Sequence, residues 1–181
     1  MRYTPDMAPP IRSAARFGVS YRPAGDEDAP FLGAVYASTR AEEVAATGWP
    51  IEQQHAFLAQ QHEAQHIYYR QVYTRTEWLV IERGGVAIGR LYLAEWQREL
   101  RIVDIALLPE GRGQGVGEAI MRDIGADAAS RGKVVSIHVE KNNPARTLYE
   151  RLGFVPVEDK GVYELMEWTP PRAEADGGEP S

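Results

Sequence analysis

The chain has 181 residues, enough for one domain of ordinary size and too few for two comfortable ones. Hydrophobic residues make up 44% and charged residues 25%, which is typical of a soluble globular protein, and a net charge of -6 argues against a general nucleic-acid binder. The absence of cysteine excludes disulfides, cysteine metal sites and thiol nucleophiles, and no membrane-length apolar run or signal peptide is present, so we expect a cytoplasmic protein.

Both ends of the chain are expected to lie outside the folded domain. Residues 1–16 contain Pro5, Pro9 and Pro10 and show no sustained hydrophobic period, so we expect a flexible segment. Residues 169–181 are rich in Pro, Gly, Glu and Ser, a composition that buries too little surface to offset the entropy of ordering, so we expect a disordered tail. The predicted domain therefore spans residues 17–168.

Helices precede strands in the first half of this domain. Residues 17–22 alternate apolar and polar side chains, which predicts a short strand. Residues 26–70 show helical spacing with a break at Trp49-Pro50, which predicts two helices. Gly84-Gly85 lies between two runs of strand-forming residues and predicts a hairpin.

Strands and helices alternate in the second half. A strand over 101–107 precedes a helix that begins near Gly115, because Val116 and Ile120 start an apolar row spaced four apart, and Gly132 ends this helix. The remaining elements are expected to be a strand at 134–140, a helix after Asn143-Pro144, and strands near 154–158 and 162–168. This order predicts an α+β domain with one mixed sheet.

A glycine-rich turn between the strand at 101–107 and the following helix carries the main functional signal. Gly113, Gly115 and Gly117 alternate where the helix begins, so a ligand can approach the backbone closely. Unpaired N–H groups at a helix N-terminus favour an anion, and Arg112 adds a donor, so we expect a pyrophosphate here. The turn matches neither the P-loop nor the dinucleotide pattern. A glycine-rich connection without a ligand is the alternative.

Two motifs together resemble the GNAT (Gcn5-related) N-acetyltransferases. The run from Arg112 to Gly117 is similar to the family's R/Q-x-x-G-x-G/A signature, and the run from Asn143 to Tyr149 with Leu152-Gly153-Phe154 is similar to its second hallmark. With the element order, the resemblance covers about residues 17–168. It implies a mixed, mostly antiparallel central sheet with helices on both faces and a splay between two central parallel strands.

The resemblance also implies acetyl-CoA as the cosubstrate, with no metal expected. The pantetheine arm would lie along the end of the strand before the glycines, and backbone amides around 113–118 would hold the pyrophosphate. The residues implied in cofactor binding are Ile105, Ala106, Leu107, Leu108, Arg112, Gly113, Gln114, Gly115, Val116, Gly117, Glu118 and Asn143.

The reaction implied is the attack of a primary amine on a thioester, which requires proton transfer because an alkyl ammonium is protonated at neutral pH. Tyr149 matches the family's general acid, although its position on the apolar stripe of its helix also suits a core aromatic. Backbone N–H groups of the strand at 134–140 would stabilise the oxyanion.

The base is less well defined by the resemblance. Many relatives carry a glutamate near the position of Arg101, and an arginine is no base at ordinary pH. Asp104 has the opposite parity to Arg101, so strand alternation predicts that it points to the other face. His138 occupies the place of a glutamate in relatives that acetylate ribosomal-protein N-termini, and Glu140 could assist it; a packing histidine or a water chain is the alternative.

The acceptor pocket is expected between the first two helices and the last strands. Tyr36, Arg40 and Tyr69 are its candidate residues. We expect a small-molecule amine slightly more than a protein amine, no nucleic acid or membrane partner, and a monomer or homodimer. A non-catalytic acetyl-CoA-binding sensor would share the glycine turn and lack the catalytic groups.

A competing motif lies on the second predicted helix. His62-Glu63-Ala64-Gln65-His66 spells H-E-x-x-H, the zinc-binding pattern of metallopeptidases. The longer zincin pattern fails because position 69 is Tyr69 and position 72 is Val72. We therefore treat a zinc metallopeptidase as a minor alternative.

Overall fold

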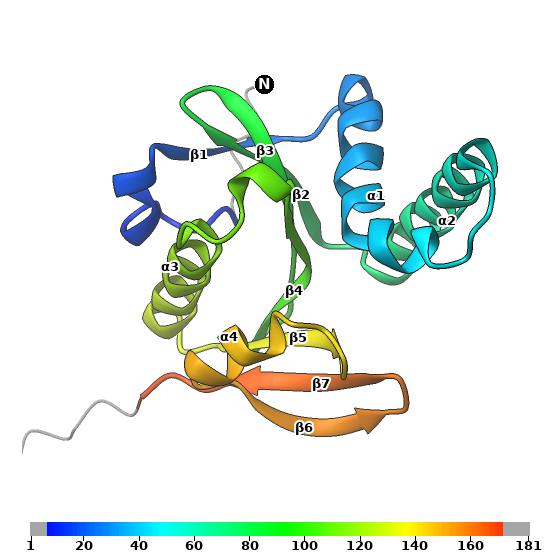
Figure 1. Ribbon diagram of the computed structural model, residues 1–181. Helices are drawn as coiled ribbons and strands as arrows, with labels where there is room; N and C mark the ends of the chain where they lie inside the picture. The colour runs from blue at the N-terminus through cyan, green and yellow to red at the C-terminus, as the bar shows by residue number, and fades with distance from the viewer. Residues whose placement is uncertain (1–6, 172–181) are drawn as a thin grey trace, which may run out of the picture.

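A computed structural model describes residues 7–171 (Figure 1). The parts of the two predicted terminal segments at residues 1–6 and 172–181 lie outside the described residues. The helices are η1 (Ser13–Phe17), η2 (Asp26–Asp28), α1 (Ala29–Ala45), α2 (Ile51–Val72), η3 (Pro109–Gly111), α3 (Val116–Ser130) and α4 (Arg146–Arg151). The strands are β1 (Val19–Pro23), β2 (Thr76–Arg83), β3 (Val86–Glu95), β4 (Glu99–Leu107), β5 (Val134–Glu140), β6 (Val155–Lys160) and β7 (Tyr163–Trp168).

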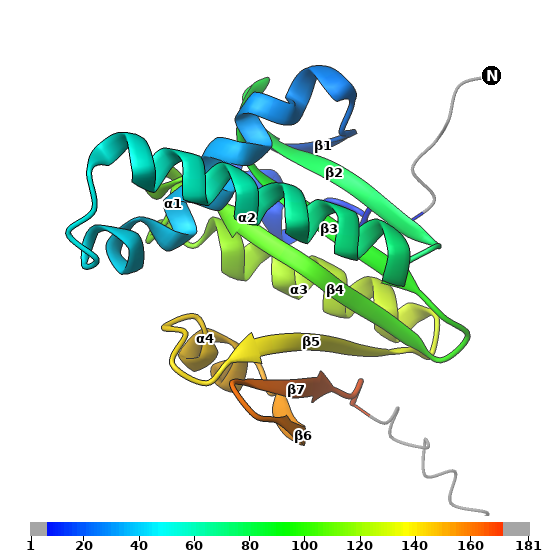
Figure 2. The same cartoon turned by 90° about the vertical axis from the view of Figure 1, so that its right-hand side faces the viewer.

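One mixed sheet organises the domain. Its strand order is β1-β2-β3-β4-β5-β7-β6, and β4 and β5 form its parallel pair while the other neighbours are antiparallel. Helices α3 and α4 lie on one face, and α1 and α2 lie on the other (Figures 1 and 2). The predicted α+β fold with a mostly antiparallel sheet and helices on both faces is confirmed.

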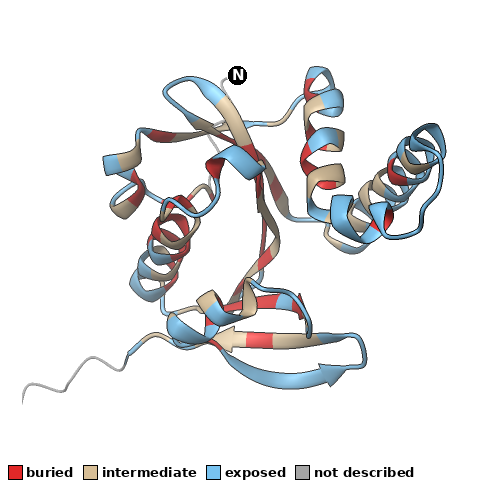
Figure 3. Cartoon of the chain, viewed as in Figure 1, coloured by how far each residue is buried: buried red, intermediate tan, exposed pale blue. Residues whose placement is uncertain are grey.

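The main core lies between the sheet and α3. The row that begins at Val116 continues through Ile120 and Ile124, and both isoleucines are fully buried in a core cluster with residues of the sheet. Figure 3 shows buried residues both on α3 and on the central strands. At the far end of the sheet, Gly84 and Gly85 both have positive φ, which is the backbone of the tight hairpin turn that the sequence predicts.

The segment before β1 is tied to α3 by one buried carboxylate. Asp123 of α3 accepts hydrogen bonds from the backbone N–H groups of Arg12, Ser13 and Ala14 at 2.9, 2.6 and 3.0 Å. Burial opposes the ionisation of Asp123, but these bonds outweigh it and lower its pKa. Residues 12–17 therefore pack as part of the domain.

A β-bulge in β4 changes which face its last residues occupy. Asp104 pairs with Tyr92 and Ile102 pairs with Leu93, so Val103 has no partner on β3. The regular alternation predicted from the sequence is therefore wrong at Asp104. This residue shares the α1 and α2 face with Arg101, because the extra residue between them restores the same parity.

Helix α2 buries fewer of its residues than α3 does. Leu58 is its buried residue, and it packs in a small cluster with Tyr36 and Val44 of α1. Among the helices of residues 7–171, none combines the length and apolar character that a membrane crossing needs.

Candidate functional site

The site is built where β4 and β5 part. Their pairing runs from Glu99 and Val134 to Ile102 and Ile137 and then stops, although both strands continue. Figure 2 shows the two strands close at one end and diverging toward the end where α1 and α4 lie. The predicted splay is therefore present. Beyond Ile102 and Ile137, the backbone groups of β4 and β5 that face each other are not hydrogen-bonded to each other.

The glycine-rich turn follows β4 at the mouth of this splay. Gly113 and Gly115 have φ of 71° and 86°, which favours glycine because a Cβ is strained there. The first helical hydrogen bond of α3 runs from Ala119 N to Gly115 O at 3.1 Å. Within the described residues, the backbone N–H groups of residues 113–118 meet no acceptor, so this turn presents a continuous run of donors suited to an anion.

Two side chains hold the turn in place. Arg112 donates from Nε to Leu107 O at 2.8 Å and from Nη2 to Ser38 Oγ of α1 at 2.9 Å. Gln114 accepts from Arg83 Nη1 at 2.7 Å and donates to Glu110 O at 2.9 Å. Both side chains, which the sequence placed beside the ligand, therefore fix the turn against its neighbours.

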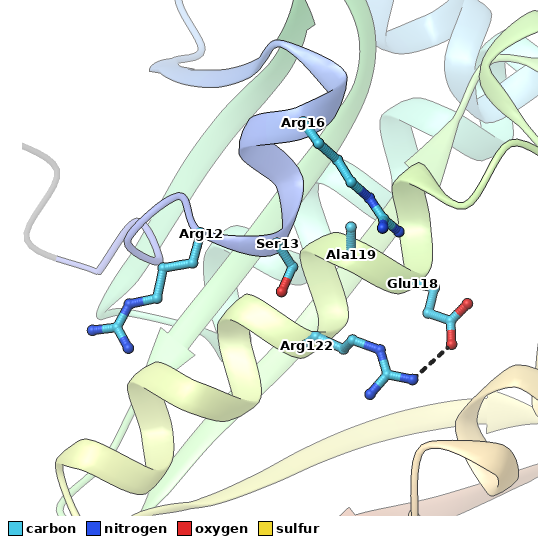
Figure 4. A pocket seen from close by; sticks show the side chains of 6 residues that line it. All are labelled: Arg12, Ser13, Arg16, Glu118, Ala119 and Arg122. Atoms are coloured by element: carbon cyan, nitrogen blue, oxygen red, sulfur yellow. Dashed lines mark hydrogen bonds and ion pairs between the residues drawn. The ribbon is translucent and has the colours of Figure 1, made fainter.

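A hollow of about 270 Å³ lies beside the first two turns of α3, next to this donor run (Figure 4). Its lining residues are Arg12, Ser13, Arg16, Glu118, Ala119 and Arg122. Arg122 pairs with Glu118 at 3.0 Å, and Arg151 of α4 reaches the same carboxylate at 3.3 Å. The arginines add positive charge at the end of α3 where an anion would bind.

Tyr149 of α4 is buried at 6% exposure and packs its ring 5.9 Å from that of Phe154. Burial and, to a smaller extent, the charge of Asp104 raise the pKa of Tyr149 to about 12. The hydroxyl is therefore protonated over the whole physiological range. The two descriptions of this residue, core aromatic and proton donor, are compatible in one side chain.

Asn143 caps the short helix that carries Tyr149. Its Oδ1 accepts the backbone N–H of Ala145 at 2.9 Å, a turn that orients the first residues of α4. A contact of Asn143 with a cofactor would therefore use its amide nitrogen or its backbone.

His138 lies on β5 just beyond the last pair with β4, and it is exposed. Its Nδ1 lies 3.4 Å from Arg101 Nη1. Desolvation first, and then the charges of Arg101 and Lys160, lower the pKa of His138, so the neutral form that a base requires prevails at neutral pH. Arg101 itself is held by Ser136 and Glu99, each at 2.6 Å.

Glu140 is bound to α1 across the open end of the splay. Arg40 Nη2 lies 2.8 Å from Glu140 Oε1, and the Tyr163 hydroxyl donates to the same oxygen at 3.1 Å. Arg40 also pairs with Glu43 at 3.0 Å. The sequence predicts a substrate-binding role for Arg40 and a catalytic role for Glu140. In the structure these two side chains contact each other directly.

The aromatic candidates gather between the sheet and α2. Tyr69 lies 6.4 Å from Tyr92, and Trp78 lies 4.8 Å from Tyr92 in edge-on geometry. Burial and the charge of Asp104 raise the pKa of Tyr69. Tyr36 of α1 is buried and lies on the same side of the sheet.

The histidines of the H-E-x-x-H motif also face this layer. His62 lies 5.4 Å from the ring of Tyr36, and His66 lies 6.2 Å from that of Trp78. Desolvation is the main cause that lowers the pKa of both. Across residues 7–171 no three acidic or histidine side chains are grouped as metal ligands would be. In this structure the two imidazoles pack on aromatic rings.

Sequence reasoning missed the pair formed by Arg90 and Asp104. Arg90 lies in the buried run of β3, and its Nη2 lies 2.5 Å from Asp104 Oδ2. A charged residue inside an apolar strand was the available signal for Arg90. The placement of Asp104 depends on the bulge, for which the sequence carried no signal.

Comparison with known proteins agrees with the two motifs. A model of the acetyltransferase (GNAT) domain matches residues 74–156. A Bacillus subtilis protein provisionally named ribosomal protein bS18-alanine N-acetyltransferase is 33% identical over 103 residues. Residues 74–156 are therefore similar to the GNAT acetyltransferase domain. The aligned region covers 50% of this chain and spans 66% of that relative.

Solved structures share the GNAT fold. The PaiA N-acetyltransferase from Thermoplasma acidophilum, solved with coenzyme A, has a TM-score of 0.62 at 15% identity and covers 83% of this chain and 98% of its own. The yncA protein from Salmonella typhimurium, solved with acetyl-CoA, has a TM-score of 0.51 at 19% identity, over 87% of this chain and 97% of its own.

Proposed function

We propose that this GNAT domain transfers an acetyl group from acetyl-CoA to a primary amine. The observation that carries the proposal is the run of backbone N–H groups at 113–118, which lack acceptors within the described residues and lie at the mouth of the splay. Such a run suits a diphosphate. Two structural neighbours were solved with coenzyme A or acetyl-CoA, which supports the same ligand here.

The residues around the splay supply the required proton transfers. His138, kept neutral by its surroundings, takes a proton from the acceptor ammonium. The free amine forms a C–N bond at the thioester carbonyl, and unpaired N–H groups of the β5 edge stabilise the oxyanion. The C–S bond then breaks and Tyr149 gives its proton to the leaving sulfur. The attacking nitrogen loses its second proton, which returns through solvent to the Tyr149 oxygen, and a neutral amide and CoA thiol result. Glu140 acts indirectly in this proposal, by holding Arg40 of α1 over the site.

A small-molecule amine remains our preferred acceptor. Helix α1 is held at both sides of the splay, by the ion pair of Arg40 with Glu140 and by the hydrogen bond from Arg112 to Ser38. This position of α1 leaves less room for a folded protein to reach the splay. The name of the Bacillus relative points instead to a protein alanine, so both classes belong in the test.

Calorimetry with acetyl-CoA followed by a thiol-release assay tests the proposal. Benzylamine, spermidine and a peptide beginning with alanine are offered separately at neutral pH. We expect heat on adding acetyl-CoA and amine-dependent release of CoA. Binding without turnover of any amine would favour a sensor, and no binding by folded protein would refute the cofactor assignment.

A further inference from the structure

The outer face of α2 carries an exposed row of uncharged side chains. Six residues are spaced alternately four and three apart, so they lie along one side of the helix, and all six are exposed. Figure 2 looks onto this side of the molecule, and no other described element lies in front of α2. We call this row the α2 seam, and it consists of Gln53, Phe57, Gln60, Ala64, Ile67 and Gln71.

The composition of the α2 seam differs from that of the rest of the surface. Charged residues make up 25% of the chain, yet the charged residues of α2 all lie on one flank beside the seam. They share this flank because Glu52, Glu63 and Arg70 are separated by nearly whole turns of helix. The centre of a protein interface is likewise depleted in charge, whereas a solvated helix face is rich in it.

Apolar side chains in the seam lie open to solvent. Phe57 is 36% exposed and Ile67 is 48% exposed. Trp49, in the connection between α1 and α2, packs edge-on against Phe57 with the ring centroids 5.3 Å apart, and it is also 36% exposed. Exposed aromatic residues at the edge of an uncharged face are typical of an interface, because covering them removes apolar surface from water.

The seam is complementary to a second copy of itself. In an antiparallel pair of α2 helices that sets Gln60 against the partner's Ala64, Phe57 meets the partner's Ile67. The same register sets the Gln53 amide against that of the partner's Gln71. A contact of this kind uses the same patch on both subunits, so it closes at two copies. Ala64 near the two-fold axis allows the helices to approach closely.

Charge favours both a second copy as the occupant and the antiparallel direction. Two copies with a net charge of -6 repel each other least where the contact contains no carboxylate, as in the seam. Glu52 and Arg70 lie five turns apart on the flank, so an antiparallel pair brings Glu52 near the partner's Arg70 at each end. A parallel pair would bring like charges together, and its helix dipoles would repel.

The length of α2 sets the expected strength of such a contact. With 22 residues the helix is about 33 Å long. One pair of helices of this length lies at the small end of specific interfaces, below about 1,200 Å² of total buried surface. We therefore expect a reversible dimer with a Kd on the order of 10 µM, in place of an obligate one.

We propose that the α2 seam is the interface of a two-fold homodimer in which the two α2 helices pack antiparallel. The proposal does not depend on acetyl transfer, because no residue of the seam has a role in the proposed reaction. Failure of the dimer would therefore leave the proposed function standing, and an inactive protein would leave the dimer standing.

Sedimentation velocity of the full chain between about 1 and 200 µM tests the proposal, because the dimer fraction follows protein concentration. We expect the mass to rise from 20.2 kDa toward twice that value. Ile67→Glu places a carboxylate in the seam and should weaken association at least about tenfold. Ile51→Glu is the matched control, because Ile51 is 61% exposed on the same helix but lies off the seam. Circular dichroism and acetyl-CoA calorimetry verify the fold of both variants.

Disulfide cross-linking tests the direction of the helices, since the chain has no cysteine of its own. Positions 53 and 71 are about 27 Å apart along α2, too far to be linked within one copy. The double variant Gln53→Cys with Gln71→Cys should form covalent dimers under mild oxidation, and each single variant should form them much more slowly.

Three results would overturn the proposal. The first is a chain that stays monomeric at every concentration, which would leave the seam to a different protein. The second is a dimer that Ile67→Glu does not weaken, because the interface would then lie elsewhere. The third is cross-linking of either single variant as fast as that of the double variant, which would exclude the antiparallel pair.

Discussion

Replacing Tyr149 with Phe separates its chemical role from its packing role. The ring, which is buried against Phe154, is kept, and one hydroxyl is lost. With a pKa of about 12, this hydroxyl is about 3.5 pH units less acidic than a thiol of reference pKa ~8.5. Proton transfer to the departing sulfur is therefore uphill, so we expect a loss in kcat of roughly 10- to 100-fold, at or below the low end for general acid catalysis.

Stopped assays of CoA release, with urea denaturation of the same samples, measure both effects. The free energy of unfolding should change by about 1 kcal/mol or less, since only one polar atom is removed. Tyr21→Phe is the matched control, because its hydroxyl is buried without a partner among the described residues and lies on β1. A Tyr149→Phe enzyme with wild-type kcat, or one whose loss follows unfolding alone, would refute the proton-donor assignment.

Three further predictions concern stability, pH dependence and cofactor binding. Asp123→Asn should lower the free energy of unfolding by about 2–4 kcal/mol. Because the pKa of Asp123 is lowered in the folded protein, the stabilisation by Asp123 is complete above the unfolded pKa of ~3.9 and is lost as the pH falls through the folded pKa. Urea titrations at neutral and acid pH will check both effects. His138→Gln should remove the acid limb of kcat/KM, which in the wild type should lie below the ordinary histidine value of ~6.5 because the pKa of His138 is lowered; an unchanged profile would exclude His138 as the base. Gly115→Ala places a Cβ on a backbone with φ of 86° and 3.4 Å from Phe17 Cζ. The resulting strain of roughly 1–2 kcal/mol should weaken acetyl-CoA binding about tenfold, as measured by calorimetry. Gly48→Ala is the control, because Gly48 is also left-handed but lies in the α1–α2 connection, and this variant should bind acetyl-CoA as the wild type does.

Local patterns in the sequence predict the elements that frame the site. The row that begins at Val116 specifies the buried face of α3, because residues four apart share one side of a helix. Gly84-Gly85 specifies the hairpin, and Gly113 and Gly115 specify a turn that other residues adopt only with strain. In each case the backbone conformation depends on a few adjacent residues, and the sequence alone determined it.

The partners of individual side chains depend on the tertiary structure. Arg112 and Gln114 lie in the turn as predicted, yet their side chains bond to α1 and to the β2–β3 hairpin, which are distant in sequence. Likewise, nothing local to Arg40 or Glu140 indicates that they pair across the splay.

The bulge at Val103 shows this division most clearly. Alternation along a strand holds only while the register is regular, and the register of β4 is set by its pairing with β3. One unpaired residue moves Asp104 to the α1 and α2 face, where it meets the buried Arg90. The sequence by itself thus determined the glycine-rich turn, and the packed sheet decided which face Asp104 occupies, because pairing between strands selects the face of every side chain beyond a bulge.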